Sequence, residues 1–159
     1  MEFYKMNHEV TEKDLKNFNM ENQRIGVIVH IEDKDGNILL QQRGLKSRDE
    51  NGLFEDVGGS LEKFDTNYRA AIIREMHEEM GKEAKIELSN TSNIYHVSKN
   101  NTNWIFVIFK GQYLGGDIKI MEPEKCMGYK FFSYNEILNS NLVTDSCKYL
   151  CKEIRNNKV

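Results

Sequence analysis

The sequence predicts an α/β fold, an α/β/α sandwich on a mixed sheet. Three observations indicate this: β-rich runs come first, one amphipathic helix follows them, and further strands precede a closing helix. With 159 residues, of which 39% are apolar and 30% charged, the chain is long enough for one sizeable core and short for two. We therefore expect a single domain over residues 1–159.

The first two strands are expected at Arg24–Glu32 and Asn37–Arg43. Both runs are rich in β-branched and apolar residues, and the DKDG sequence between them is a hairpin turn signal. The two strands should therefore pair in an antiparallel fashion. A polar loop flanked by Gly44 and Gly52 then leads into Leu53–Val57 and the Gly pair.

A helix is expected from about Asn67 to Met80, with Gly81 as its C-cap residue. At roughly 100° per residue, its apolar side chains form a stripe that can be buried. Glu75, Glu78 and Glu79 fall within about one third of the circumference beside that stripe. Three residues can each serve as N-cap through a side-chain oxygen: Asp65, Thr66 and Asn67.

The second half of the chain contains the remaining elements. Apolar and aromatic runs predict four further strands, and two later stretches have a helical pattern. The strands are expected at Ala84–Leu88, Asn93–Ser98, Trp104–Gln112 and Gly128–Phe132, and the helices at Tyr134–Leu138 and Thr144–Asn156.

The three glutamates of the predicted helix suit divalent-cation chemistry. Like charges three or four residues apart destabilise a helix by roughly 0.2–0.5 kcal/mol per pair, so a compensating interaction is expected. Hard cations such as Mg²⁺ bind through a few carboxylates together with substrate phosphates. Cations held in this way neutralise a diphosphate and lower the pKa of a bound water, which are the requirements for hydrolysing that linkage. Glu78 and Glu79 are the first candidates for metal ligands, and Glu75 completes the set.

The segment Gly58–Lys82 resembles the Nudix box, whose pattern is G-x5-E-x7-R-E-U-x-E-E-x-G-U with U an apolar residue. Six positions of its second half match: Arg74, Glu75, Met76, Glu78, Glu79 and Gly81. The resemblance implies a Nudix-type sandwich fold over roughly Arg24–Lys152, with residues 1–23 outside it as an N-terminal extension. It also implies Mg²⁺ as cofactor, with Mn²⁺ as an alternative, the Gly59 carbonyl as a further metal ligand, and an orienting role for Arg74 towards a carboxylate.

The box of this chain departs from the pattern in three places. Asp65 stands where the first Glu is expected, fourteen residues rather than thirteen separate Gly59 from Arg74, and Lys82 replaces the last apolar residue. An extra residue within the helix would rotate the carboxylates by roughly 100°, so we place it in the loop before the helix, near Phe64–Asn67. The role of Asp65 stays open.

The general base and the substrate contacts are less constrained. Family members take the base from the box or from a loop between late strands, and that loop here offers Glu122 and Glu124, which can also be surface charges. Arg43 and Trp104 are candidate substrate-binding residues. Trp104, Tyr129 or Phe131 can stack on a base, although aromatics at alternating strand positions are more often part of a core. Glu62 can reach the metals or remain in solvent.

The region around Trp104 and Tyr129 is similar to the Nudix branch, MutT-like, that hydrolyses nucleoside triphosphates, including oxidised ones. This implies a pyrophosphohydrolase that releases a nucleoside monophosphate and pyrophosphate. ADP-ribose, sugar-nucleotide or dinucleotide substrates remain open within the enzyme class. A non-catalytic nucleotide sensor is the alternative of another class, and the intact acidic cluster argues against it.

Composition bears on partners and compartment. The net charge is −3 and the basic residues are scattered, so the sequence predicts no basic patch that would bind long nucleic acid. Neither a membrane-spanning run nor a signal peptide is seen, so we expect a cytoplasmic protein that binds a small nucleotide, and a homodimer is compatible with the sequence. Cys126, Cys147 and Cys151 match no metal-ligand spacing and should be reduced, mostly buried thiols.

Overall fold

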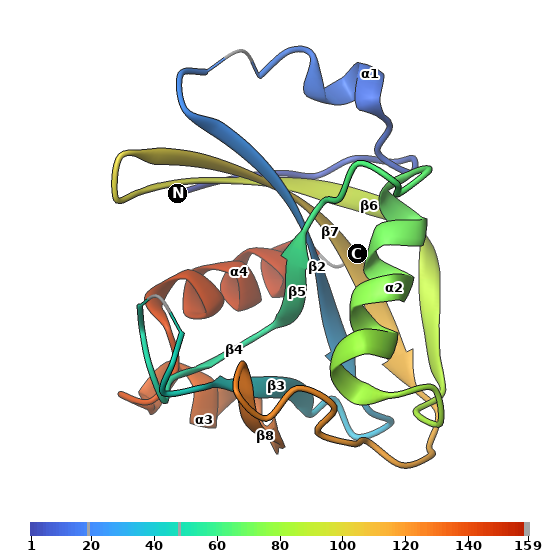
Figure 1. Cartoon of the computed structure of the whole chain (residues 1–159), viewed down its shortest axis with the longest axis vertical. Coiled ribbons are helices and arrows are strands. Elements are labelled where there is room, and N and C mark those ends of the chain that lie inside the picture. Colours follow the sequence, from blue (N-terminus) through green and yellow to red (C-terminus); the bar gives the residue numbers. More distant parts are fainter. Residues whose placement is uncertain (19, 48, 158–159) are drawn as a thin grey trace.

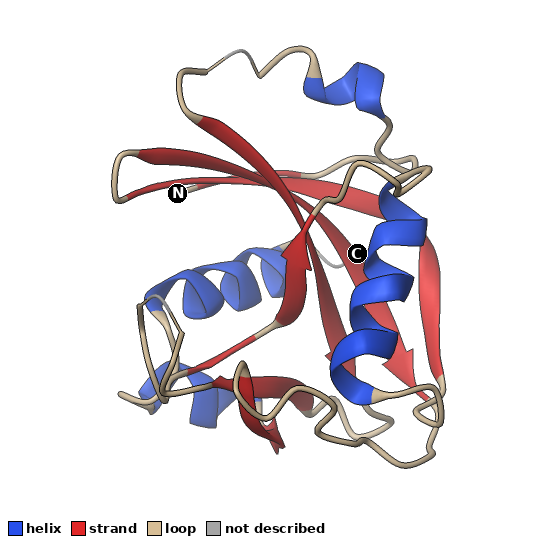
Figure 2. Ribbon diagram, in the orientation of Figure 1, coloured by secondary structure: helices blue, strands red, loops and turns tan. Residues whose placement is uncertain are grey.

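The computed structural model describes residues 1–18, 20–47 and 49–157. Figures 1 and 2 show a strongly twisted sheet with helices packed around it. The elements are β1 (Glu2–Tyr4), α1 (Glu12–Leu15), β2 (Gln23–Glu32), β3 (Ile38–Arg43), β4 (Phe54–Glu55), β5 (Val57–Ser60), α2 (Tyr68–Met80), β6 (Ile86–Lys99), β7 (Thr102–Tyr113), β8 (Cys126–Phe132), α3 (Tyr134–Asn139) and α4 (Asp145–Asn156).

An eight-stranded mixed sheet forms the middle of the molecule. The main strand order is β1-β6-β7-β2-β3-β4, while β5 pairs with β2 and β8 pairs with β3. β2 and β7 run parallel over ten residue pairs, from Gln23 opposite Asn103 to Glu32 opposite Gln112. The other strand pairs are antiparallel. The predicted mixed-sheet α/β fold is therefore confirmed.

The side chains of β2 alternate between the two faces of the sheet. Val27, Val29 and Ile31 are fully buried in the cluster that includes Ile72 and Met76 of α2. Ile28 lies on the opposite face, packed against the cluster that contains Leu150 and Ile154 of α4. Because successive side chains of a strand point to opposite faces, one central strand is buried on both sides and the helices form two outer layers.

Helix α2 has the ends that the sequence predicts. Asn67 is the N-cap, and its side-chain oxygen accepts a hydrogen bond of 2.8 Å from the Ala70 N–H. Gly81 follows the helix with a φ of 82° and donates its N–H to the His77 carbonyl. The helix is continuous between these caps, so the extra residue of the box lies before it, as predicted. Glu75, Glu78 and Glu79 therefore stay on one side of the helix.

The hairpin and the two C-terminal helices are also confirmed. The Asp33 carboxylate accepts hydrogen bonds of 2.9 Å from the Asp35 and Asn37 N–H groups, and this closes the DKDG turn between β2 and β3. Thr144 caps α4 through a bond to the Cys147 N–H. Among the described residues, no helix is long and apolar enough to span a lipid bilayer. The three cysteines are buried free thiols, as expected.

The predicted division of one strand into two was wrong. The strands expected at Ala84–Leu88 and Asn93–Ser98 form one strand, β6, with an irregular register between Leu88 and Ser92. The polar residues between them interrupt the pattern, but pairing with the long strand β7 resumes beyond them. The segment Leu53–Val57 contributes to two strands that are divided at Asp56, because Glu55 pairs with β3 whereas Val57 pairs with β2.

Residues 1–18 pack against the sheet although they lie outside the family resemblance. β1 pairs with β6, and Val10 and Leu15 are buried in the same core cluster as α2. The Ser92 hydroxyl accepts a 2.7 Å hydrogen bond from the Val10 N–H. This segment therefore covers the edge and one face of the sheet.

Candidate active site

The carboxylates of α2 lie beside the backbone of β5. Glu75 and Glu79 are each 9% exposed, whereas the side chain of Glu78 is 49% exposed. A β-carbon added to Gly59 would lie 2.3 Å from the carboxyl carbon of Glu75. A side chain at position 59 would therefore displace the Glu75 carboxylate from its present position. The structure thus brings Glu75 against Gly59, one of the contacts that the sequence predicts.

Arg74 is held by a network of acidic groups. Its Nε and Nη2 atoms donate to the two oxygens of Asp65, each at 2.9 Å, and its Nη1 atom donates to Glu75 and Glu78 at 3.1 Å. Nη2 also donates to the Ser60 carbonyl. Hydrogen bonding to Arg74 holds the pKa of the Asp65 carboxyl below its usual value. Asp65, whose role the sequence left open, anchors the arginine that orients the glutamates.

Glu79 is a buried carboxyl group on which the charges of other acidic residues outweigh that of Lys125. Its Oε2 atom has no hydrogen-bond partner among the described residues. Burial, followed by the charges of Glu75, Glu122 and Glu55, raises the pKa of Glu79 to about 9. Burial likewise raises the pKa of Glu75. Such a concentration of acidic oxygens is costly unless positive charge is added, so these residues fit a divalent cation.

Of the two candidates for a general base, the structure brings only Glu122 to this cluster. Glu122 raises the pKa of both Glu75 and Glu79 through its charge, and it pairs with Lys125 at 3.3 Å. Glu124 is exposed. Its carbonyl packs on Gly44, where an added β-carbon would lie 2.2 Å from that oxygen.

Glu55 was missed by the sequence reasoning. It accepts a 2.7 Å hydrogen bond from Arg43 and adds its charge to the environment of Glu79. The signal in the sequence is the acidic pair Glu55–Asp56 immediately before the residues of the box. Glu62, in contrast, has an exposed side chain, and its N–H donates to Asp65.

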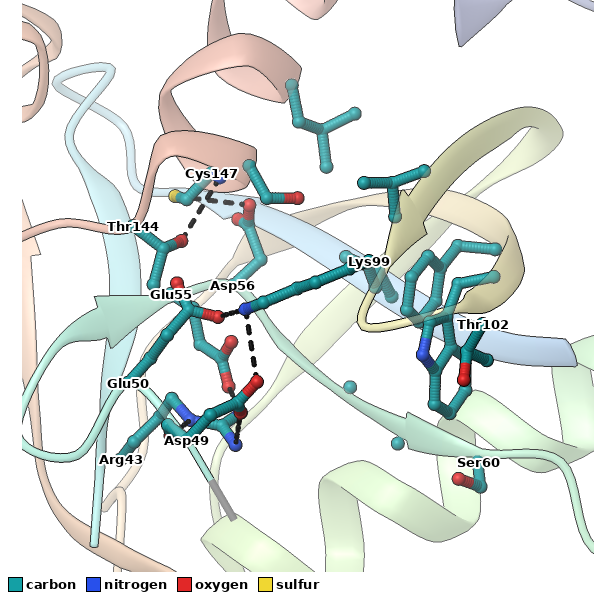
Figure 3. A pocket seen from close by; sticks show the side chains of 18 of the residues that line it. Arg43, Asp49, Glu50, Glu55, Asp56, Ser60, Lys99, Thr102, Thr144 and Cys147 are labelled. Atoms are coloured by element: carbon teal, nitrogen blue, oxygen red, sulfur yellow. Dashed lines mark hydrogen bonds and ion pairs between the residues drawn. The ribbon is translucent and has the colours of Figure 1, made fainter. Parts of the chain in front are cut away.

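A cavity of about 350 Å³ opens beside this cluster. Figure 3 shows it between the residues of β4 and β5, the start of α4 and the β6–β7 hairpin. Trp104 forms part of its wall and stacks on Phe106 with ring centroids 5.2 Å apart and planes inclined by 5°. Lys99 pairs with Glu50 and, at 3.2 Å, with Asp49, which links the hairpin to the loop after β3. The cavity thus combines an aromatic wall with charged groups.

The structure places the two predicted substrate-binding residues, Arg43 and Trp104, in the lining of this one cavity. The hydrogen bonds of Arg43 go to Asp49 and Glu55, so it organises the neighbouring loop. Tyr129 and Phe131 pack against the core instead, and the Tyr129 hydroxyl donates to the Glu79 carbonyl at 2.9 Å. Of the three aromatic candidates for stacking, only Trp104 lines the cavity.

Fold and site together define an α/β sandwich with a candidate divalent-metal site beside an aromatic cavity. A family model described as NUDIX domain matches residues 22–151. The chain therefore belongs to the NUDIX family.

Individual relatives agree with this assignment. The chain is 45% identical over 62 residues to a CTP pyrophosphohydrolase of Escherichia coli (strain K12), and the match covers 39% of this chain and 44% of that protein, less than half of its length. The crystal structure of a MutT protein from Methanosarcina mazei Go1 has a TM-score of 0.71 at 21% identity, covering 88% of this chain and all of that one. The NUDIX domain of Shewanella oneidensis NrtR, solved with ADP ribose, has a TM-score of 0.67 at 17% identity and covers 92% and 98%. These two structures share the fold.

Proposed function

We propose that this protein is a Mg²⁺-dependent pyrophosphohydrolase that converts a nucleoside triphosphate to the monophosphate and pyrophosphate. The observation that carries this proposal is the buried carboxyl group of Glu79, whose Oε2 atom has no hydrogen-bond partner among the described residues and whose pKa is raised by burial and by the charges of Glu75, Glu122 and Glu55. A folded protein maintains such a group where a cation compensates it. The aromatic cavity beside the cluster supports a nucleotide as the ligand.

Glu75 and Glu79 would hold the metal, together with the Gly59 carbonyl and Glu78 from the exposed side. When bound, Mg²⁺ would supply positive charge to the diphosphate and lower the pKa of a water molecule. Arg74 would maintain the directions of Glu75 and Glu78, because it already donates to both carboxylates and is itself held by Asp65. Its role would be to position the metal ligands rather than to bind phosphate.

Glu122 is our candidate for the general base. It lies close enough to Glu75 and Glu79 to influence the protonation of both, and its side chain is 34% exposed, so an attacking water can reach it. A carboxylate in that position would accept the proton of the water as the water attacks phosphorus. Glu124 is proposed to have no direct role.

The nucleobase would enter the cavity beside Trp104. The half-buried Trp104, which lines the cavity and stacks on Phe106, would offer an aromatic surface to the base, and base stacking on such surfaces is sequence-tolerant. The similarity to a CTP pyrophosphohydrolase favours a nucleoside triphosphate. ADP-ribose is the second candidate, favoured by the fold that this chain shares with the ADP ribose-bound NUDIX domain.

A substrate panel tests the proposal. Nucleoside triphosphates, oxidised triphosphates, ADP-ribose, NADH and dinucleoside polyphosphates would be incubated with Mg²⁺, and the products separated by ion-exchange chromatography. We expect a triphosphate to give monophosphate and pyrophosphate, with the label from ¹⁸O-water in the monophosphate. Orthophosphate as first product would contradict the proposed bond, and ADP-ribose turnover alone would select the second candidate. Binding without turnover in all cases would indicate a nucleotide sensor.

A further inference from the structure

A second group of potential ligands lies where α4 packs on the sheet, and two of its members, Asp56 and Cys147, line the cavity. It consists of His30 on β2, Asp56 at the junction of β4 and β5, and Cys147 and Cys151 on α4. These residues are 2%, 6%, 4% and 2% exposed, respectively. Figure 3 shows Asp56 and Cys147 facing each other beside Thr144. The proposed hydrolysis uses none of these four side chains.

The separations between the potential ligand atoms are in the range of the edges of a tetrahedral zinc site, and His30 and Cys147 each approach a different oxygen of Asp56. Zinc binds sulfur at about 2.3 Å and nitrogen or oxygen at about 2.0–2.2 Å, so the edges of the tetrahedron measure roughly 3.3 Å for N···O, 3.5 Å for S···O and 3.8 Å for S···S. His30 Nδ1 lies 3.2 Å from Asp56 Oδ1, Cys147 Sγ lies 3.5 Å from Asp56 Oδ2, and the two sulfurs are 4.0 Å apart. Ligand atoms of His30, Asp56 and Cys151 also lie within 4.8 Å of one another.

The charges in this region also suit a cation. Asp56 is buried, and the partners found for its carboxylate are the His30 ring and the Cys147 thiol rather than a lysine or arginine of the described residues. Two sulfurs, one imidazole and one carboxylate form a donor set that zinc prefers to Mg²⁺, which selects oxygen ligands.

We propose that His30, Asp56, Cys147 and Cys151 form a closed four-ligand site for Zn²⁺, separate from the Mg²⁺ site on α2. Four protein ligands leave no open position for a substrate, so the site would be structural. It connects β2, the point where the chain passes from β4 to β5, and α4. A metal in this position would therefore fix one side of the cavity.

The sequence conceals this site because its ligands are far apart in the chain. Cys147 and Cys151 are one helical turn apart and project from one face of α4, but the other two ligands, on β2 and at the β4–β5 junction, lie more than ninety residues earlier. Only the packing of α4 on the sheet brings them together. The third thiol, Cys126, lies on β8, and its sulfur donates to the Gly128 carbonyl instead.

Cobalt provides a direct test, since Co²⁺ bound by thiolates in a tetrahedral site has strong visible and near-ultraviolet absorption. The full chain would be reduced, freed of metal and titrated with Co²⁺ alone. We expect these bands to saturate at about one Co²⁺ per chain and to disappear when Zn²⁺ is added in equal amount. Mass spectrometry of the native protein, purified without chelators, should show about one Zn²⁺ per chain.

Matched variants assign the ligands. The double variant Cys147→Ser/Cys151→Ser should lose the thiolate bands, whereas Cys126→Ser and Glu79→Gln should retain them. Circular dichroism reports whether each variant is folded. Folded wild-type protein without thiolate bands would overturn the proposal even if the double variant does not fold. Bands that persist in the double variant, or vanish in Cys126→Ser, would overturn it as well. Glu79→Gln removes a ligand of the proposed Mg²⁺ site on α2 and leaves the four proposed zinc ligands in place. A negative result for zinc binding is therefore distinguishable from a negative result for the proposed hydrolysis.

Discussion

Replacement of Glu79 by Gln should stabilise the metal-free protein while impairing its activity. The carboxyl pKa of Glu79 is raised from 4.5 to about 9 in the folded chain, whereas in the unfolded chain it has its ordinary value. Between these values the folded state binds the proton more tightly than the unfolded state, so the stability of the metal-free protein falls as the pH rises through this range. The amide of Gln has the shape of the neutral acid and does not ionise.

The magnitude follows from the same shift. At pH 7 the Glu79 carboxyl is protonated in the folded chain but ionised in the unfolded chain, where the pKa lies about 2.5 units below the pH. Each of these units costs roughly 1.4 kcal/mol, so the free energy of unfolding at pH 7 is lower by up to about 3 kcal/mol than it is near pH 4.5. For a chain of this size that corresponds to about 6–12 °C in Tm. The advantage of Glu79→Gln should therefore be largest near pH 7–9 and vanish near pH 4–5.

Thermal unfolding in EDTA and in Mg²⁺, between pH 5 and pH 9, measures this effect. We expect Mg²⁺ to raise the Tm of the wild-type protein at pH 7–8 and to have little effect on Glu79→Gln, whose turnover should be at least about a hundredfold lower. Glu78→Gln is the matched control, because its side chain is half-exposed and its loss should lower turnover without the gain in stability. Equal Tm values for wild type and Glu79→Gln in EDTA at pH 7–8 would refute the reasoning.

Four further substitutions test other parts of the site. Glu122→Gln should lower turnover by about a hundredfold and Glu124→Gln by less than about threefold in a pyrophosphate-release assay, and similar losses for both would contradict the choice of base. Trp104→Ala should raise KM about tenfold with little change in kcat, since stacking contributes roughly 1–3 kcal/mol, and a loss confined to kcat would exclude stacking. Asp65→Asn should cost about 1.5–3 kcal/mol in urea unfolding at pH 7, because it breaks the charged pair with Arg74. The lowered pKa of Asp65 means that its contribution is present above pH 4 and is lost as the pH falls further, so a pH-independent difference would argue against this pair.

The sequence by itself determined the features that depend on neighbours along the chain. The spacing of Glu75, Glu78 and Glu79 sets their common side of α2, because helical phase is a local property. The DKDG turn and the placement of the extra residue before Asn67 follow from equally local preferences. The mixed sheet followed from the order of the strands and helices, which limits the available folds.

The tertiary structure alone decided which of these groups meet and how deeply they are buried. Glu79 lies next to Glu55 and Glu122 only because α2, β4 and the segment before β8 converge, and its raised pKa results from that burial. The union of Ala84–Leu88 and Asn93–Ser98 into β6 likewise depended on the length of the partner strand β7. The same holds for the group around Asp56, whose members come from three separate elements. Burial and charge proximity arise from contacts between residues that are distant in the chain, and local sequence patterns do not specify those contacts.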